Sequence, residues 1–335
     1  MKLLRPVSAL RTCRLTRPQT LHLLAPSTYL TAQSRMSSHH APGPPHENLT
    51  RLAARLPQGS WDTHMHIVDL ARFPAASKGQ YAPTSHTLSD ARSFFSPLGI
   101  KRMVVVQPSF YGTDNGCTLD ALRQLGPERG RAVVQFDPAV TAESTLREWH
   151  ALGVRGVRLN FKSVGAKLEA ESLASALHRY ADAVRGLGWV LEVYIAMEDM
   201  PLLEPIVAGL GDVKLCIDHF GHPSQASLST AQSVAVMPGF SALAKLLERE
   251  NVWVKVSAAY RLDRDPKHPL IQSLAREILR RRPDRCVFAT DWPHTRYDGL
   301  DVTVYLKELL DWCEAEGVDV RRICVDNPRE LFDCR

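Results

Sequence analysis

The chain has 335 residues, of which 44% are hydrophobic and 23% are charged. This composition is typical of a globular protein with a large core, and it excludes a disordered or collagen-like chain. No apolar run approaches the roughly 18 residues that a membrane-spanning helix needs, so we expect no membrane partner. The formal net charge of +5 comes mostly from the first 40 residues. The remaining body is close to neutral, which argues against a nucleic-acid partner.

The first part of the sequence differs in composition from the rest. Residues 1–40 are rich in Arg, Ser, Thr and Leu, and no acidic residue precedes Glu47. This is typical of a mitochondrial transit peptide, which predicts a location in the mitochondrial matrix. The alternatives are a disordered extension of a cytoplasmic protein, or a translation start at Met36. Residues 41–48 are rich in proline, so we expect 1–48 to be leader and linker and 49–335 to be one folded domain.

The seven cysteines are dispersed, and none stands in a C-x-x-C arrangement. An odd number of scattered cysteines predicts reduced thiols in an intracellular protein.

From Ser60 onward, short runs of apolar and β-branched residues alternate with longer segments of helical periodicity. The predicted strands are residues 61–67, 102–107, 131–136, 154–160, 189–195, 213–218, 252–257 and 285–290. The predicted helices are residues 88–98, 115–125, 141–152, 169–187, 198–210, 238–250, 269–282 and 300–316. Apolar strands that alternate with helices indicate a parallel sheet covered by helices.

Eight βα units predict a closed (β/α)₈ TIM barrel. An open, doubly wound sheet is the structural alternative. The turn after the first predicted strand has no G-x-G-x-x-G pattern, which counts against a dinucleotide-binding fold of that kind.

Two histidines lie one residue apart in the first predicted strand. His64 and His66 project to the same face, because side chains alternate along a strand. In isolation, such a pair is more often two hydrogen-bonded polar residues at a strand end than part of a catalytic site. However, His219 follows the sixth predicted strand and Asp291 the eighth. In a barrel the active site lies at the carboxyl ends of the strands, so we expect these four side chains to converge there.

Over residues 57–335 the sequence resembles the amidohydrolase superfamily. Within this superfamily it resembles the amidohydrolase-related lactonases, above all those that act on 2-pyrone-4,6-dicarboxylate. The motifs that carry this resemblance are D-T-H-M-H at 62–66, D-H-F-G at 218–221 and T-D-W-P at 290–293. Further matching segments are residues 81–83, 107–115, 156–161 and 257–261. The resemblance implies a barrel of the amidohydrolase type and a hydrolase that opens a small carboxylated lactone, acting as a monomer or small homo-oligomer.

The resemblance also implies a role for each matching residue. Asp291 would be the general base that takes a proton from water, and His64, His66 and His219 would polarise the lactone carbonyl. The positions expected to contact the substrate are Tyr81, Arg158, Tyr194, Arg261, His222 and His294. Among these, the two arginines would clamp carboxylates, and the two tyrosines would donate hydrogen bonds. At His222 and His294 the chain departs from the family pattern, so the exact substrate stays open.

Ester hydrolysis needs a nucleophilic water, stabilisation of the oxyanion and a route for the proton. A carboxylate beside a histidine cluster can supply all three, and the sequence has no G-x-S-x-G motif that would indicate a serine nucleophile.

Many members of the superfamily use divalent metal ions, and a binuclear centre requires a bridging lysine on the fourth strand. Here Arg158 lies in that strand, with Lys162 the nearest lysine. This disfavours a binuclear centre. The dicarboxylate lactonases that the chain resembles work without a metal, so the resemblance implies action without a metal here. One Zn²⁺ held by His64, His66 and Asp291 is the alternative.

The alternative functions are a metal-dependent decarboxylase of an aromatic or enol carboxylic acid, and a sugar-acid lactonase. A non-catalytic barrel is disfavoured, because a scaffold has no use for such a cluster.

Overall fold

The computed structural model describes residues 46–74, 83–162 and 168–333, with side chains from Leu49 onward. The predicted leader and Tyr81 lie outside the described residues, so both remain predictions. Among the described residues, no helix is long and apolar enough to cross a membrane. The five described cysteines are all free thiols.

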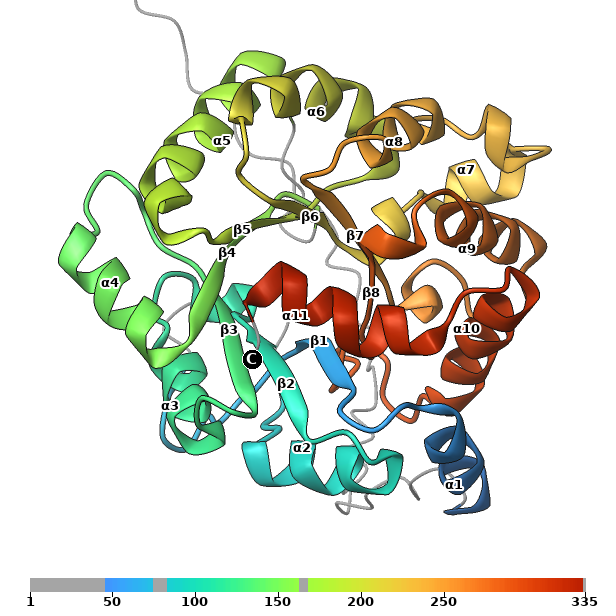
Figure 1. Cartoon of the computed structure of the whole chain (residues 1–335), viewed down its shortest axis with the longest axis horizontal. Helices are drawn as coiled ribbons and strands as arrows, with labels where there is room; N and C mark the ends of the chain where they lie inside the picture. Colours follow the sequence, from blue (N-terminus) through green and yellow to red (C-terminus); the bar gives the residue numbers. More distant parts are fainter. Residues whose placement is uncertain (1–45, 75–82, 163–167, 334–335) are drawn as a thin grey trace, which may run out of the picture. The chain divides into compact units, whose positions relative to one another are not determined.

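Eight parallel strands form one sheet in which each strand pairs with the next along the chain. They are β1 (Trp61–Met65), β2 (Arg102–Val106), β3 (Gly130–Val134), β4 (Val154–Asn160), β5 (Val190–Tyr194), β6 (Leu215–Ile217), β7 (Val252–Val256) and β8 (Cys286–Phe288). Figure 1 shows them as a ring surrounded by helices. The predicted TIM barrel is therefore confirmed, because apolar strands that are buried on both faces need helices outside and a packed interior.

Backbone hydrogen bonds between β1 and the segment after β8 bring the two ends of the sheet together. The amide of His66 donates to the carbonyl of Trp292 at 2.8 Å, and the amide of Asp291 donates to the carbonyl of His64 at 2.9 Å. These bonds place the H-x-H pair next to Asp291, although more than two hundred residues separate them in the sequence.

The eight predicted helices are confirmed, with ends that differ by a few residues. The helices are α1 (His46–Arg55), α2 (Leu88–Phe95), α3 (Gly116–Leu125), α4 (Glu143–Leu152), α5 (Ala170–Val184), α6 (Met200–Val207), α7 (Gln225–Thr230), α8 (Phe240–Leu247), α9 (Pro269–Arg281), α10 (Thr303–Ala315) and α11 (Asn327–Phe332). Helices α1, α7 and α11 were not predicted from the sequence. The latter two have six residues each, too few for a helical period to stand out.

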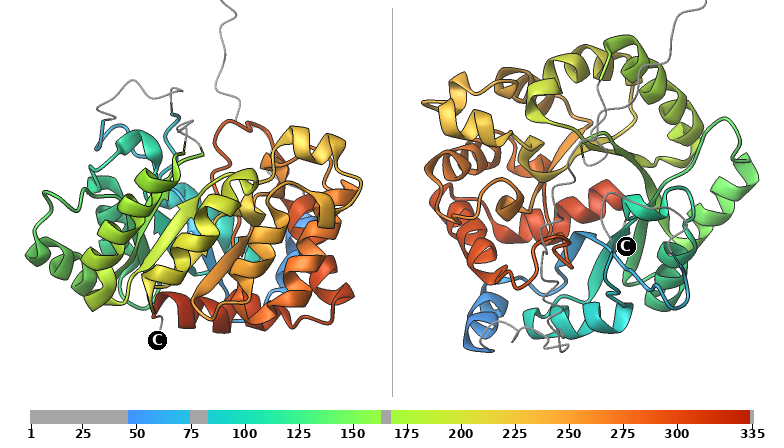
Figure 2. Two further views of the ribbon diagram at one scale, coloured as in Figure 1. Left: turned by 90° about the horizontal axis from the view of Figure 1, so that it is seen from above. Right: turned by 180° about the vertical axis from the view of Figure 1, so that it is seen from behind.

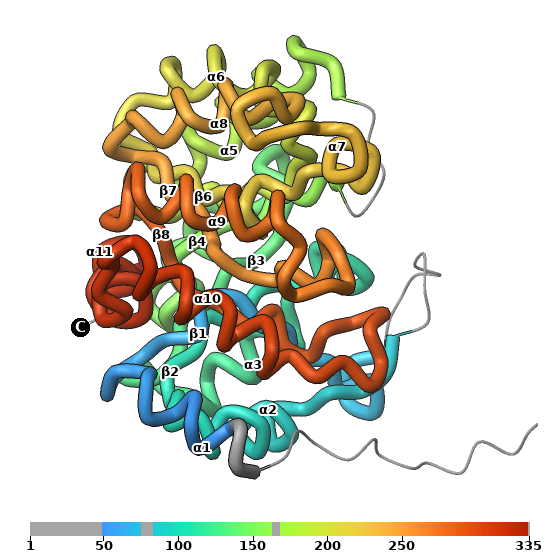
Figure 3. The backbone as a smooth tube through the Cα atoms, turned by 90° about the vertical axis from the view of Figure 1, so that its right-hand side faces the viewer, coloured from blue at the N-terminus to red at the C-terminus, as the bar shows by residue number. Residues whose placement is uncertain are grey.

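Helix α11 lies across the end of the barrel at which the strands begin, as Figures 1 and 2 show. Its Leu331 and Phe332 belong to the same buried cluster as Trp61 at the start of β1. The Lys214 ammonium, just before β6, donates to the carbonyl of Glu330 at 2.7 Å. Figure 3 shows this helix at one end of the strands and the long segments that follow the strands at the other. The carboxyl ends of the strands, where the sites of TIM barrels lie, are therefore the expected place for a binding site.

Asp62 also holds the two ends of the sheet together. Its fully buried carboxylate accepts hydrogen bonds from the backbone N–H of His64 and of Thr290, each at 2.9 Å. We expect Asp62→Ala to lower the free energy of unfolding by about 2 to 4 kcal/mol, because two buried donors lose their partner. Urea unfolding followed by circular dichroism measures this loss. Glu148→Ala, which removes an exposed carboxylate on α4, is the control and should change stability by less than about 0.5 kcal/mol.

Candidate active site

The structure brings the predicted histidines and the aspartate together at the carboxyl ends of the strands. Oδ1 of Asp291 lies 3.7 Å from Nε2 of His64 and 3.5 Å from Nε2 of His66. The His219 ring centroid is 4.9 Å from that of His64. All four side chains are buried or nearly so. Three separate strand ends therefore deliver one compact cluster.

The backbone is strained in the segments that follow β6, β7 and β8. The φ angles are +52° at His219, +54° at Ala258 and +61° at Asp291, in the left-handed region that residues with a Cβ rarely adopt. Such conformations cost of order 1 to 3 kcal/mol each and persist where the surroundings hold them. Their position after β6, β7 and β8 marks this rim of the barrel as a functional site.

Asp291 is ionised, and two hydrogen bonds to one of its carboxylate oxygens hold it in place. Tyr260 donates its hydroxyl to Oδ2 at 2.6 Å, and Nε of Arg261 donates to the same oxygen. Burial on its own would raise the pKa of Asp291, but the Arg261 guanidinium and the neighbouring histidines hold it well below its usual range. Because both donors use Oδ2, the other oxygen faces the histidines and can accept a proton.

Beneath the histidines lies a buried ionic cluster that the sequence analysis missed. Lys255 of β7 contacts the Glu192 carboxylate of β5, and its Nζ lies 2.9 Å from Nδ1 of His64. Asp218 Oδ1 is 3.5 Å from the same ammonium. Burial, followed by the charge of Asp218, raises the pKa of Glu192 to about 7. A single charged residue within an otherwise apolar strand, as in V-W-V-K-V, is the sequence signal for this cluster.

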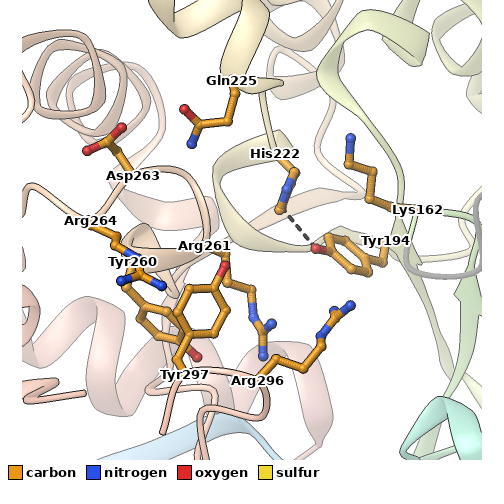
Figure 4. Close-up of a pocket in the computed structure, with 10 residues that line it drawn as sticks. All are labelled: Lys162, Tyr194, His222, Gln225, Tyr260, Arg261, Asp263, Arg264, Arg296 and Tyr297. Atoms are coloured by element: carbon orange, nitrogen blue, oxygen red, sulfur yellow. Dashed lines mark hydrogen bonds between the residues drawn. The ribbon is translucent and has the colours of Figure 1, made fainter. Parts of the chain in front are cut away.

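A cavity of about 550 Å³ opens above the cluster (Figure 4). Its lining consists of Lys162, Tyr194, His222, Gln225, Tyr260, Arg261, Asp263, Arg264, Arg296 and Tyr297. Four of these side chains are cationic and one is anionic. The Tyr194 hydroxyl and Nδ1 of His222 are 3.0 Å apart, on the side of the cavity opposite Tyr260 and Arg264. Since Tyr260 and Arg261 also contact Asp291, the cavity adjoins the cluster and suits an anionic ligand.

The predicted substrate-binding residues take different places. Tyr194, Arg261 and His222 line the cavity. Arg158 lies outside this lining. Its Nη1 donates to the carbonyl of Gln107 at 2.8 Å, and its buried Nε has no partner among the described residues. His294 also lies outside it, packed edge-on against Tyr260 with ring centroids 5.5 Å apart. Arg264 and Arg296 are cavity residues that the sequence analysis did not identify, because they stand in loops without a recognisable motif.

The His/Asp cluster has the donors that a metal ion would need. One ligand atom from each of His64, His66 and Asp291 lies within 4.8 Å of the others, and the same holds for His64, Asp218 and His219. Two imidazoles and a carboxylate suit Zn²⁺. Bound there, the ion would polarise a carbonyl or activate a water molecule. The ammonium of Lys255 and the guanidinium of Arg261 are the unfavourable neighbours for such a cation.

Comparison with known proteins identifies the family of this chain. The 4-sulfomuconolactone hydrolase of Hydrogenophaga intermedia is 32% identical over 302 residues, which are 87% of this chain and 93% of that protein. The 2-pyrone-4,6-dicarboxylate hydrolase of Comamonas testosteroni is 28% identical over 85% of this chain and 93% of its own length. A crystal structure from Pseudomonas putida, named for 2-pyrone-4,6-dicarboxylic acid hydrolase, matches with a TM-score of 0.67 at 31% identity, covering 84% of this chain and 99% of that one. The amidohydrolase family itself matches residues 61–334. The chain therefore belongs to the amidohydrolase family, and the prediction of an amidohydrolase-type enzyme is confirmed.

Proposed function

We propose that this protein hydrolyses a small carboxylated lactone by attack of water on the ring carbonyl. The observation that carries the proposal is the position of the ionised Asp291 carboxylate. Its Oδ1 faces His64 and His66. Its Oδ2 accepts hydrogen bonds from Tyr260 and Arg261, which also line the cationic cavity. This arrangement supplies a base, carbonyl-polarising groups and an anion-binding surface side by side.

In the proposed mechanism, Oδ1 of Asp291 accepts a proton from the attacking water, and N–H groups of the histidine cluster stabilise the negative charge that develops on the carbonyl oxygen. The oxygen of the opened ring leaves as an alcohol or enol after it receives the proton. Arg261 orients Asp291 through Nε, and the rest of its guanidinium faces the cavity and the substrate.

The charge of the cavity supports a substrate with at least one acid group beyond the ester. Lys162, Arg264 and Arg296 add three cations to Arg261, and Asp263 is the one carboxylate in the lining described above. Guanidinium forks suit carboxylate and sulfonate oxygens. The relatives named above are named for lactones that carry such groups, which favours an anionic lactone over a neutral sugar lactone for this chain.

A substrate panel tests the proposal. Purified protein is assayed with 2-pyrone-4,6-dicarboxylate, 4-sulfomuconolactone, a sugar-acid lactone and an uncharged lactone. We expect ring opening of an anionic lactone, with kcat/KM at least about 100-fold above that for the uncharged one, since two charge-assisted contacts contribute about 3 kcal/mol or more. Ring opening with no preference for charge would contradict the anionic substrate class, and no ring opening of any lactone would contradict the proposal.

We further propose that the reaction proceeds without a metal ion, with a Zn²⁺-dependent decarboxylase of an aromatic or enol acid as the second candidate. The specific observation in favour of the second candidate is the set of three ligand atoms from His64, His66 and Asp291.

Dialysis of the purified protein against a strong chelator distinguishes these two functions. We expect lactone hydrolysis to keep at least about half of its rate, because Asp291 and the histidines can act without an ion. Metal analysis before and after dialysis shows whether an ion was removed. If activity falls with the metal content and zinc restores it, the metal-free mechanism is wrong. Decarboxylation that requires zinc would support the second candidate.

A further inference from the structure

The two histidines of the H-x-H motif have different hydrogen-bond partners at Nδ1. Nδ1 of His66 lies 2.7 Å from the carbonyl of Val106, which can only accept a hydrogen bond, so this nitrogen carries the proton. Nε2 of His66 is therefore a lone-pair nitrogen that faces Asp291 and His64. This is the hydrogen-bonding pattern that a histidine ligand of a metal ion usually shows.

The partner of Nδ1 of His64 is a hydrogen-bond donor and not an acceptor. Its Nδ1 lies 2.9 Å from Nζ of Lys255, and that nitrogen contacts the Glu192 carboxylate as an ion pair. An ammonium group donates and never accepts. Nδ1 of His64 must then accept, which leaves the single proton of the neutral ring on Nε2.

The carboxylates near His64 do not provide an alternative partner in this arrangement. Oε1 of Glu192 and Oδ1 of Asp218 each lie 3.4 Å from Nδ1 of His64, yet neither oxygen makes a hydrogen bond among the described residues. Without the lysine, either carboxylate is close enough to accept a proton from Nδ1. The position of Lys255 between them thus decides which nitrogen of His64 is protonated.

We propose that Lys255 is a positioning residue that fixes His64 as a hydrogen-bond donor toward the active site, while the Val106 carbonyl fixes His66 as an acceptor. The pair is then a donor and acceptor couple and not two equivalent ligands. In agreement with this, Nε2 of His64 and Nε2 of His66 are 3.3 Å apart, with their rings nearly perpendicular at 88°. One nitrogen donates to the other.

This assignment extends the proposed function, because it gives each histidine its own task there. When a lactone is bound, its carbonyl oxygen would replace His66 as the acceptor of the His64 Nε2–H, as negative charge develops on that oxygen. Nε2 of His66 would accept a hydrogen bond from the attacking water, next to Asp291. A metal ion bound by both Nε2 atoms would need the His64 proton to move to Nδ1, against the lysine.

The direct test uses the wild-type chain without substrate, so its result does not depend on the proposed function. Nitrogen-15 NMR of histidine-labelled protein at neutral pH distinguishes a protonated from an unprotonated ring nitrogen, and the His64 signals are assigned by their loss in His64→Gln. We expect the proton of His64 on Nε2 and that of His66 on Nδ1. A proton on Nδ1 of His64, or on both of its nitrogens, would overturn the proposal.

Replacing the lysine tests its role. In Lys255→Met we expect the His64 proton to move to Nδ1, where Glu192 or Asp218 accepts it. The His66 proton should stay on Nδ1, because the Val106 carbonyl still accepts it, and this is the internal control. Affinity for Zn²⁺ alone, measured by competition with a chelating dye, should increase about 10- to 100-fold, the range by which the hydrogen-bond partners of metal ligands change metal affinity. On a lactone substrate, kcat should fall more than KM changes.

Lys245→Met, which removes an exposed lysine of α8, is the control and should leave the NMR signals, zinc affinity and kcat as in wild type. If Lys255→Met does not fold, Lys255→Leu offers a second side chain without a hydrogen-bond donor, with the same expected tautomer. An unchanged His64 tautomer in a folded variant would show that the lysine does not position the histidine.

Discussion

Asp291→Asn should reduce kcat for lactone hydrolysis by about 10²- to 10⁴-fold, the range that a positioned general base contributes. The amide has nearly the same shape as the carboxylate, and its oxygen can still accept from Tyr260 and Arg261 at the position of Oδ2. The group that faces the histidines then becomes an NH₂, which cannot take a proton from water. Steady-state kinetics with the best lactone of the panel measures the loss.

The matched control for this variant is Asp298→Asn, an exposed aspartate in the same loop after β8. It should keep kcat within about twofold, as surface substitutions usually do. Circular dichroism and urea unfolding check that Asp291→Asn is folded, because the change leaves the Arg261 guanidinium without its buried counter-charge. Near wild-type turnover in the folded variant would rule out Asp291 as the base.

The barrel could be predicted from the sequence because its main signals are local. Seven of the eight observed strands lie within their predicted ranges, and β3 begins one residue earlier, at Gly130. Apolar, β-branched runs identify such strands by themselves. The convergence of His64 with Asp291 follows from the fold, since every parallel strand of a barrel ends at the same rim. That part of the site needs only the order of the elements and the position of each residue at a strand end.

The partners of these residues could not be predicted in the same way. Whether Arg261 contacts a substrate or Asp291 depends on the turn after β7, where Ala258 has a positive φ. Whether Lys255 faces the interior or the helices depends on strand tilt and register, which one sequence does not specify. Side-chain pairing across the barrel is a property of the assembled core, so Glu192 and Lys255 became recognisable as a pair only in the structure.

Arg261 is where this difference matters most for experiment. The family resemblance implies that Arg261 is a substrate clamp, which predicts mainly an increase in KM when it is replaced. In the structure its Nε contacts Oδ2 of Asp291, and other parts of the side chain line the cavity. One residue thus serves the substrate and the base together.

We therefore expect two effects from Arg261→Met. The first is a decrease in kcat/KM for anionic lactones of about 10- to 150-fold, through loss of a charge-assisted contact of about 1.5 to 3 kcal/mol. The second is a change in pH dependence. The guanidinium is the main group that holds the pKa of Asp291 below its usual range against the effect of burial, so its removal raises that pKa. Asp291 then becomes protonated at a higher pH as the solution is acidified, and the acidic limb of the kcat/KM profile should move to higher pH.

Arg264→Met separates the two effects, because Arg264 lines the same cavity while the described contacts of Asp291 come from Tyr260, Arg261 and the histidines. It should raise KM for anionic lactones and leave the acidic limb in place. The measurement is the pH profile of kcat/KM for the wild type and both variants at constant ionic strength. If both arginine variants change only KM, Arg261 is a clamp and nothing more. If the limb moves in Arg261→Met alone, the ionisation of Asp291 depends on this one guanidinium.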